Sequence, residues 1–171
     1  MEILCILLLI VSIILIMSIF YFNAYNKIYV IKVKMDNSND KITKDLEEKH
    51  QIMIKLYSEI KKVVKKKDYL KDFNTLKNQK LTNYELDKEL AIHLDTMKNF
   101  KEDYKELNTD EFNNNLQKIK ELDQDITASK KFFNKNNNLL IKQLKGYIKI
   151  VAKINHISVK TSYEIKEPKK D

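Results

Sequence analysis

The sequence predicts an all-α protein in which an N-terminal transmembrane helix continues into an antiparallel four-helix bundle. Three observations carry this prediction. Residues 3–22 form an apolar run without charge, Pro or Gly. The 171-residue chain has one Gly and one Pro, so it lacks the residues that usually build hairpin turns and break helices. Later apolar residues recur at steps of three and four, which is the spacing of one buried helix face.

The apolar run is long enough to cross a bilayer, because twenty helical residues at about 1.5 Å each match a hydrocarbon core of ~30 Å. Only Met1 and Glu2 precede it, so the basic region of a signal peptide is missing. Phe22-Asn23-Ala24 is a poor cleavage site. We therefore expect residues 1–24 to be a retained anchor, with the lipid bilayer contacting residues 3–22.

Lysine asymmetry predicts the orientation of this anchor. Lys27, Lys32 and Lys34 follow the run, and no basic side chain precedes it. The positive-inside rule then predicts a single-pass cell-membrane protein with its N-terminus outside and its C-terminal bundle in the cytoplasm. Either an aromatic belt at the interface or ordinary helix packing would explain Tyr21, Phe22 and Tyr25.

The bundle is expected over residues 25–165, beginning with a helix that continues from the membrane to about Lys66, with a bend at 37–40 left open. The following Lys- and Asn-rich stretch, residues 65–81, is expected to be a connection with a short helix around Tyr69–Leu76. Helical spacing then resumes on the far side of this connection.

Two start signals mark the later helices. Residues 82–85 (TNYE) fit a capping box that opens a helix ending near Leu107. Residues 108–111 (NTDE) open another that reaches about Gly146. For residues 147–165 a short strand is one interpretation, and a helical turn or a strap over the bundle is the favoured one. Residues 166–171 are expected to be a disordered tail.

Composition argues against most kinds of active site. The net charge is +8, but all basic residues are Lys, which lacks the planar fork that grips phosphate or guanine, so no specific nucleic-acid partner is expected. Cys5 is the only cysteine and lies in the apolar run, which excludes an intrachain disulfide. His50, His93 and His156 stand far apart without a metal-binding motif. We expect no catalytic, cofactor-binding or metal-binding residues, and no small-molecule substrate.

Several polar groups allow more than one interpretation. Two acidic clusters are expected to be solvated faces, and their members are Asp40, Asp45, Glu47, Glu48, Glu102, Asp103 and Glu106. The lysines of residues 61–67 suggest an anionic-lipid contact, which a straight helix would hold far from the bilayer. The tracts at residues 113–115 and 136–138 (NNN) are either exposed faces or a polar seam for a partner helix.

Asp123 and Lys130 are seven residues apart and therefore share a helix face. With Asn134 they are expected to form polar contacts inside the bundle. If Lys130 is exposed, its replacement by Ala should cost only about 0–1 kcal/mol.

The chain resembles the LemA family of bacterial single-pass membrane proteins. The resemblance is carried by the Tyr25-Asn26 pair after the anchor, by the stretch ending in Asp45-Leu46, and by a later segment with Asp, Lys and Phe in place of the family's Glu, Arg and Tyr. The matching residues of that segment are Phe112, Ile119, Asp123, Ile126, Lys130, Phe133 and Asn134. The resemblance implies an antiparallel four-helix bundle held at the membrane, and it carries over no catalytic residue.

We therefore expect a membrane-anchored cytoplasmic helical bundle that is not an enzyme and acts as a scaffold or interaction module. The alternative is a membrane-tethered sensor or adaptor that docks a protein partner through its Lys- and Asn-rich helical surface. Either hypothesis is compatible with self-association.

Overall fold

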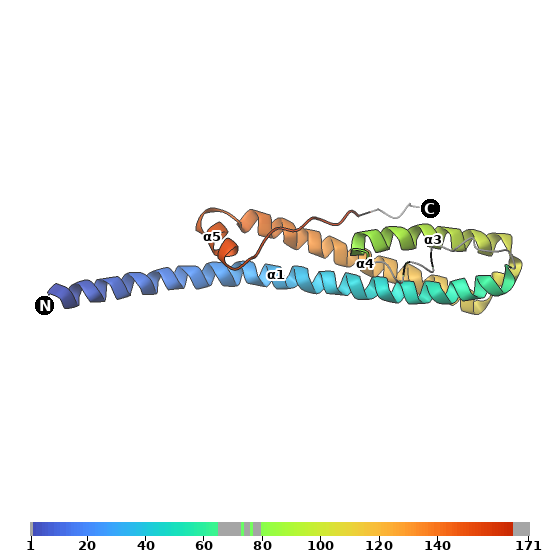
Figure 1. Cartoon of the computed structure of the whole chain (residues 1–171), viewed down its shortest axis with the longest axis horizontal. Helices are drawn as coiled ribbons and strands as arrows, with labels where there is room; N and C mark the ends of the chain where they lie inside the picture. The colour runs from blue at the N-terminus through green and yellow to red at the C-terminus, as the bar shows by residue number, and fades with distance from the viewer. Residues whose placement is uncertain (1, 65–72, 74–75, 77–79, 166–171) are drawn as a thin grey trace. The chain divides into compact units, whose positions relative to one another are not determined.

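Most of the described part of the chain is helical (Figure 1). The computed structural model describes residues 2–64, 73, 76 and 80–165. The elements are α1 (Glu2–Val63), α3 (Asn83–Asp103), the 3-10 turn η1 (Lys105–Leu107), α4 (Asp110–Gln143) and α5 (Gly146–Ile154). These helices confirm the predicted all-α fold. Within the described ranges there is no strand, so the strand interpretation of residues 147–165 is wrong.

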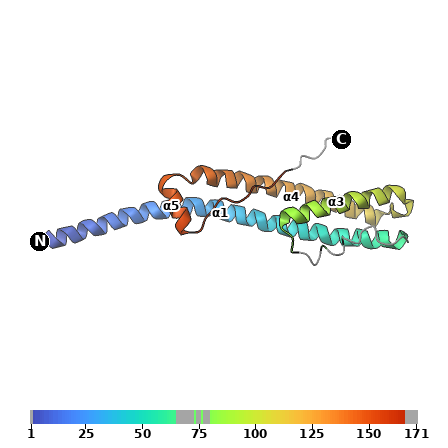
Figure 2. The ribbon, with the colours of Figure 1, turned by 45° about the horizontal axis from the view of Figure 1, so that its top comes forward.

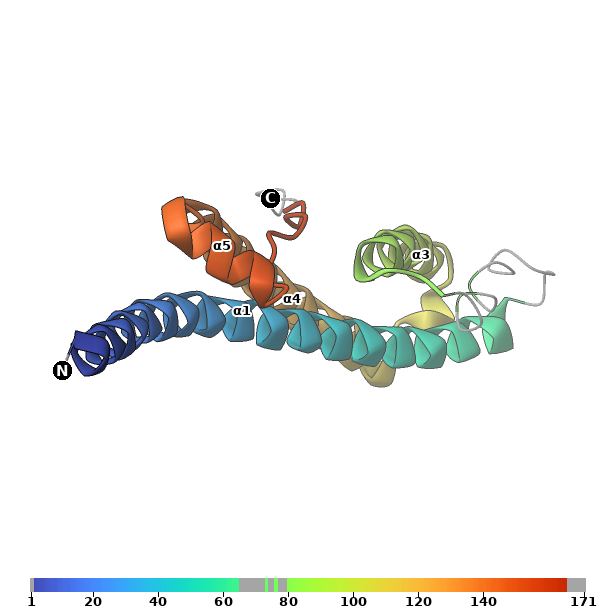
Figure 3. The ribbon, with the colours of Figure 1, turned by 60° about the vertical axis from the view of Figure 1, so that its left-hand side comes forward.

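The chain divides into two compact units, and α1 and α4 contribute to both. Unit 1 combines Met1–Ser38 with Phe132–Glu164, and unit 2 combines Asn39–Lys131 with Ile165–Asp171. The helix α1 continues without interruption through residues 37–40 (Figure 3). The predicted short helix around Tyr69–Leu76 falls largely outside the described residues. Its two described members, Phe73 and Leu76, are helical and buried.

The first part of α1 exposes apolar side chains on every face. Its large hydrophobic residues are strongly exposed from Ile3, at 81 %, to Phe22, at 60 %. Ser12 and Ser18 donate their hydroxyl hydrogens to carbonyls one turn back, so their polar groups are satisfied within the helix. By length and composition, α1 is the one helix among the described residues that could cross a membrane.

Unit 1 has its own hydrophobic core, which begins where the apolar run of α1 ends. The helices α1, α4 and α5 contribute, together with the extended segment after α5. Its buried members are Ala24, Ile28, Met35, Phe133, Leu140, Val151, Ala152 and Ile157. Tyr21 and Tyr25 pack against this core, while Phe22 is exposed. Packing therefore accounts for the two tyrosines, as one of the two interpretations predicted.

In unit 2, α4 runs opposite to both α1 and α3, which share one direction (Figure 2). The buried α1 residues continue the predicted stripe: Ile42, Leu46, Met53, Leu56 and Ile60. The other two helices of the unit also bury apolar side chains: Leu90, Leu94 and Met97 of α3, and Phe112, Ile119 and Ile126 of α4. Burying each such side chain stabilises the fold by about 1.5–3 kcal/mol.

The helix boundaries follow local chemistry. The predicted capping box is present: the Glu85 amide donates to Thr82 Oγ1 at 3.3 Å, and the Thr82 amide donates to Glu85 Oε2 at 2.8 Å. At the start of α4 the Phe112 amide donates to Thr109 Oγ1. The next boundary lies at Gly146, whose φ of +54° separates α4 from α5.

Candidate functional site

Two lysines are buried in the helical interior of unit 2. Lys49 of α1 is 2 % exposed, and its ammonium lies 2.6 Å from Asp123 Oδ1 of α4. Lys130 of α4 donates to Asp87 Oδ2 of α3, also at 2.6 Å. These pairs link α4 to both of its neighbours. Charge-assisted hydrogen bonds of this length fix the relative register of the helices they join.

The exposed interpretation of Lys130 is therefore wrong, because its side chain is only 10 % exposed. The predicted polar contacts of Asp123, Lys130 and Asn134 exist, but each residue has a different partner. Asp123 pairs with α1, Lys130 pairs with α3, and Asn134 binds the segment after α5. The spacing of seven indicated the shared face but not the partners.

Asparagine side chains of α4 hold an extended segment in unit 1. Asn137 donates to the Lys160 carbonyl at 2.6 Å and accepts from the Lys160 amide at 3.1 Å. Asn134 makes the same two bonds with Tyr163, at 2.7 and 2.8 Å. We call residues 157–165 the strap. Each amide side chain thus satisfies one backbone donor and one backbone acceptor of the strap.

These bonds correct one interpretation of the Asn tracts. In residues 136–138, Asn136 and Asn137 are buried and only Asn138 is exposed. Asn137 binds the strap of the same chain, and Asn136 donates to the Phe132 carbonyl of its own helix. In residues 113–115, Asn115 is buried as well.

Carboxylates are less uniformly solvated than predicted. Of the two acidic clusters, all members except Asp45 are exposed. Asp45 Oδ2 is buried and has no hydrogen-bond partner among the described residues. Burial raises the pKa of Asp45, and the neighbouring Asp125 and Glu48 raise it further against the lowering effect of Lys41. Burial also raises the pKa of Glu59, followed by the charge of Glu111.

Two of the three histidines meet at one aromatic ring. His50 and His93 both contact Phe73, with ring centroids 5.4 and 5.3 Å away and edge-to-face geometry. Since sequence spacing gave no reason to pair them, this arrangement was not predicted. The described residues contain no group of three or more His, Cys, Asp or Glu side chains that could hold a metal ion.

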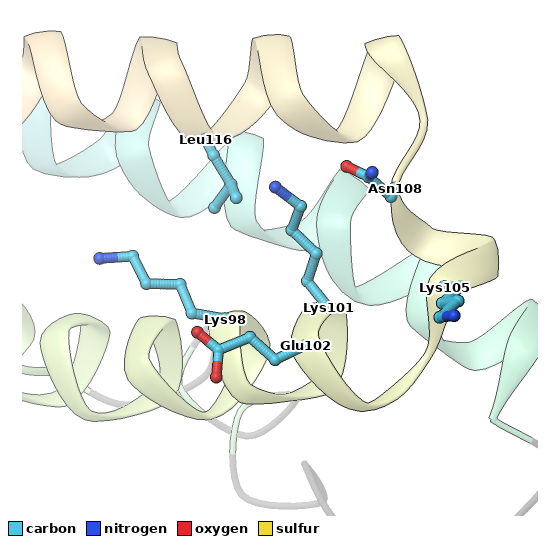
Figure 4. A pocket seen from close by; sticks show the side chains of 6 residues that line it. All are labelled: Lys98, Lys101, Glu102, Lys105, Asn108 and Leu116. Atoms are coloured by element: carbon cyan, nitrogen blue, oxygen red, sulfur yellow. The ribbon is translucent and has the colours of Figure 1, made fainter.

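The surface of unit 2 carries an open hollow of about 560 Å³. Its lining residues are Lys98, Lys101, Glu102, Lys105, Asn108 and Leu116. Figure 4 shows Lys98, Lys101 and Glu102 extending from α3, with Leu116 on the facing α4. We call this feature the basic hollow.

Three ammonium groups and one carboxylate leave the basic hollow with a local excess of two positive charges. Flexible Lys side chains around one half-buried Leu suit an acidic partner segment with an apolar residue. This surface was not predicted from the sequence. The step of three between Lys98 and Lys101 places them on one side of α3, and this spacing was the available signal, whereas Lys105 lies beyond the end of that helix.

Comparison with known proteins identifies no relative: no family model, curated protein or solved structure matches the chain. The resemblance to the LemA family therefore stays a prediction.

Proposed function

We propose that this chain is a single-pass membrane protein that displays a non-catalytic helical scaffold on the cytoplasmic side. Residues 3–22 lie in the bilayer, and residues 25–165 form the scaffold. The observation that carries the proposal is the change of character within α1. Apolar side chains are exposed all round the helix up to Phe22, and only one face is buried from Ala24 onward. Lipid is the solvent that suits the first pattern.

The interior of the helical units supports a scaffold role. Their buried charges and amides hold helices and the strap together, as in the Lys49–Asp123 pair and the Asn137–Lys160 clamp. Such groups rigidify a surface for presentation. An all-helical architecture is compatible with the LemA resemblance, and we propose membership of that family on the same residues.

Membrane extraction of the full-length chain tests the anchor. Leu9→Lys combined with Ile13→Lys places two charges in the centre of the apolar run, each costing about 2.5–3.5 kcal/mol of insertion free energy. We expect the parent protein to resist extraction by alkaline carbonate and the double variant to be released. Leu9→Phe with Ile13→Leu is the matched control and should remain in the membrane. A soluble parent protein whose intact mass shows cleavage near Ala24 would refute the proposal.

Cysteine labelling tests the orientation. In a Cys5→Ser background, Lys118→Cys introduces one thiol at an exposed position of α4. A membrane-impermeant maleimide should label this thiol only after the cells are permeabilised. Labelling in intact cells would place the scaffold outside and contradict the orientation.

The basic hollow favours a second candidate function, an adaptor that docks an acidic segment of a protein partner. Crosslinking in membranes followed by mass spectrometry should then capture one discrete partner, and Lys98→Glu with Lys101→Glu should abolish the crosslink. Lys118→Glu with Lys120→Glu, at exposed positions of α4, is the matched control. Crosslinks between copies of this chain alone favour the structural role.

A further inference from the structure

Helix α5 carries three different stripes along its nine residues. One stripe, with Val151 and Ala152, is buried in the core of unit 1. A second is apolar but exposed: Tyr147 at 52 %, Ile150 at 63 % and Ile154 at 60 %. At about 3.6 residues per turn these three residues lie on one face of the helix.

The third stripe is basic. Lys149 and Lys153 are four residues apart on the helix, Lys145 lies at its N-cap, and all three are exposed. They run beside the exposed apolar stripe, and residues 145–154 contain no acidic side chain. A helix with an exposed apolar face bordered by lysines has the composition of a helix that lies in a membrane interface.

The position of α5 in unit 1 matches this chemistry. The ring of Tyr147 contacts Phe20 edge-to-face with centroids 6.4 Å apart. At the other end, Asn155 donates to the Tyr21 hydroxyl at 2.9 Å. Figures 1 and 2 show α5 against α1 where the apolar run ends. Both ends of α5 are therefore held at the level where an anchored α1 would leave the hydrocarbon.

We infer that α5 is a second membrane contact, an interfacial helix that lies on the bilayer through Tyr147, Ile150 and Ile154 and binds anionic lipid headgroups through Lys145, Lys149 and Lys153. The inference rests on the proposed function, since it takes residues 3–22 to be in the bilayer. The exposed apolar surface of α5 continues that of α1 through the Phe20–Tyr147 contact. One bilayer thus covers both surfaces, and the lysines reach its phosphates.

The chain contains no Trp, so a single substitution supplies a unique fluorescent reporter. Ile150→Trp reports on α5, and Tyr147→Trp is a second reporter on the same face. Phe132→Trp is the matched control, because Phe132 is 47 % exposed on α4 of the same unit. Leu9→Trp reports on the anchor alone. Each full-length variant is reconstituted in vesicles of equal parts phosphatidylcholine and phosphatidylglycerol with brominated acyl chains.

Bromines near the headgroups should quench the indole of the Ile150→Trp variant and blue-shift its emission, while the indole of the Phe132→Trp variant should be quenched by aqueous acrylamide only. Identical behaviour of these two variants would overturn the inference. Shielding of the Ile150→Trp indole from acrylamide without quenching by bromine would also overturn it, because this result indicates a protein cover such as a second copy. If Leu9→Trp is quenched, such a failure concerns α5 alone. If Leu9→Trp is not quenched, the anchor itself fails.

Removing lysine charges distinguishes headgroup binding from apolar contact with the bilayer. In the Ile150→Trp background, we combine Lys149→Gln with Lys153→Gln. The affinity of α5 for phosphatidylglycerol vesicles relative to pure phosphatidylcholine vesicles should fall about fivefold for each lysine removed. Lys118→Gln with Lys120→Gln in unit 2 should leave it unchanged. An unaltered preference in the Lys149 and Lys153 variant would refute the headgroup contact.

Discussion

Lys130 Nζ of α4 lies 2.6 Å from Asp87 Oδ2 of α3, and the two partners are unequally buried. The lysine side chain is 10 % exposed and the aspartate 29 %. A buried pair contributes little net stability over an apolar replacement, but removing one partner strands the other charge. The cost should therefore depend on which partner is removed.

We predict that Asp87→Asn destabilises the protein more than Lys130→Met does. The first change leaves a nearly buried ammonium without its carboxylate, at a cost of about 2–4 kcal/mol. The second leaves a carboxylate that water can reach, at about 1–2 kcal/mol. Urea unfolding of the detergent-solubilised full chain, followed by circular dichroism, measures both free energies.

The exposed pair Lys41–Asp125 is the matched control, since its atoms are 3.4 Å apart and both side chains are more than half exposed. Lys41→Ala should cost at most about 1 kcal/mol. Equal losses for Lys41→Ala and Asp87→Asn would contradict the dependence on burial.

The Lys130–Asp87 pair shows which contacts can be predicted from the sequence and which cannot. Apolar spacing predicted the buried stripe of α1, and capping residues predicted the helix starts at Thr82 and Thr109. Both signals depend on neighbours three or four residues away. Lys130 was expected to be exposed if judged by residue type alone, since lysine is rarely buried unless paired. Its partner Asp87 is 43 residues away and is brought close only by the packing of α3 on α4.

The partner of Asn137 and the basic hollow were not predicted, for a related reason. Asn137 is an ordinary polar residue until a backbone segment is placed beside it, and the strap was only one of the interpretations of residues 147–165. The hollow needs Leu116 of α4 to face the lysines of α3. Contacts of this kind depend on the tertiary register, which local periodicity does not encode.

Asp45 makes stability depend on pH. Burial raises its folded-state pKa above the ordinary value of 3.8, so its contribution is complete below 3.8 and is lost as the pH rises through the folded-state pKa. Asp45→Asn removes the titrating group. We therefore predict that the free energy of unfolding of the variant rises relative to that of the parent protein as the pH rises from acidic to neutral.

Melting curves of both proteins across this pH range measure the difference. Asp40→Asn, which removes the same charge from an exposed position of α1, is the control and should show a flat difference. A stability difference between Asp45→Asn and the parent protein that stays constant with pH would argue against titration of the buried carboxyl.

Gly146 offers a purely conformational test. Its φ is +54°, and a Cβ built there would have no atom within 4 Å. Gly146→Ala should therefore cost about 1–2 kcal/mol through backbone strain alone. Gly146→Asn should cost clearly less, because Asn tolerates the left-handed region. Thermal unfolding of the two variants distinguishes them, and equal losses would point to a cause other than φ.

The strap gives the sharpest local prediction, because neighbouring asparagines differ in burial. Asn137 clamps both backbone groups of Lys160, whereas Asn138 is exposed. Asn137→Ala removes both hydrogen bonds to the Lys160 backbone, which should cost about 0.5–1.5 kcal/mol for each bond because Lys160 itself is exposed. Asn138→Ala removes the same side chain from solvent and should cost almost nothing.

Amide hydrogen exchange across residues 157–165 measures the effect where it arises. Asn137→Ala should speed exchange of the Lys160 amide, and Asn134→Ala that of the Tyr163 amide, while exchange in the Leu90–Met97 part of α3 stays unchanged. This pattern follows because each clamp protects one amide of unit 1 and none of unit 2. Uniform acceleration in both units would mean that the asparagines support global stability and do not clamp the strap.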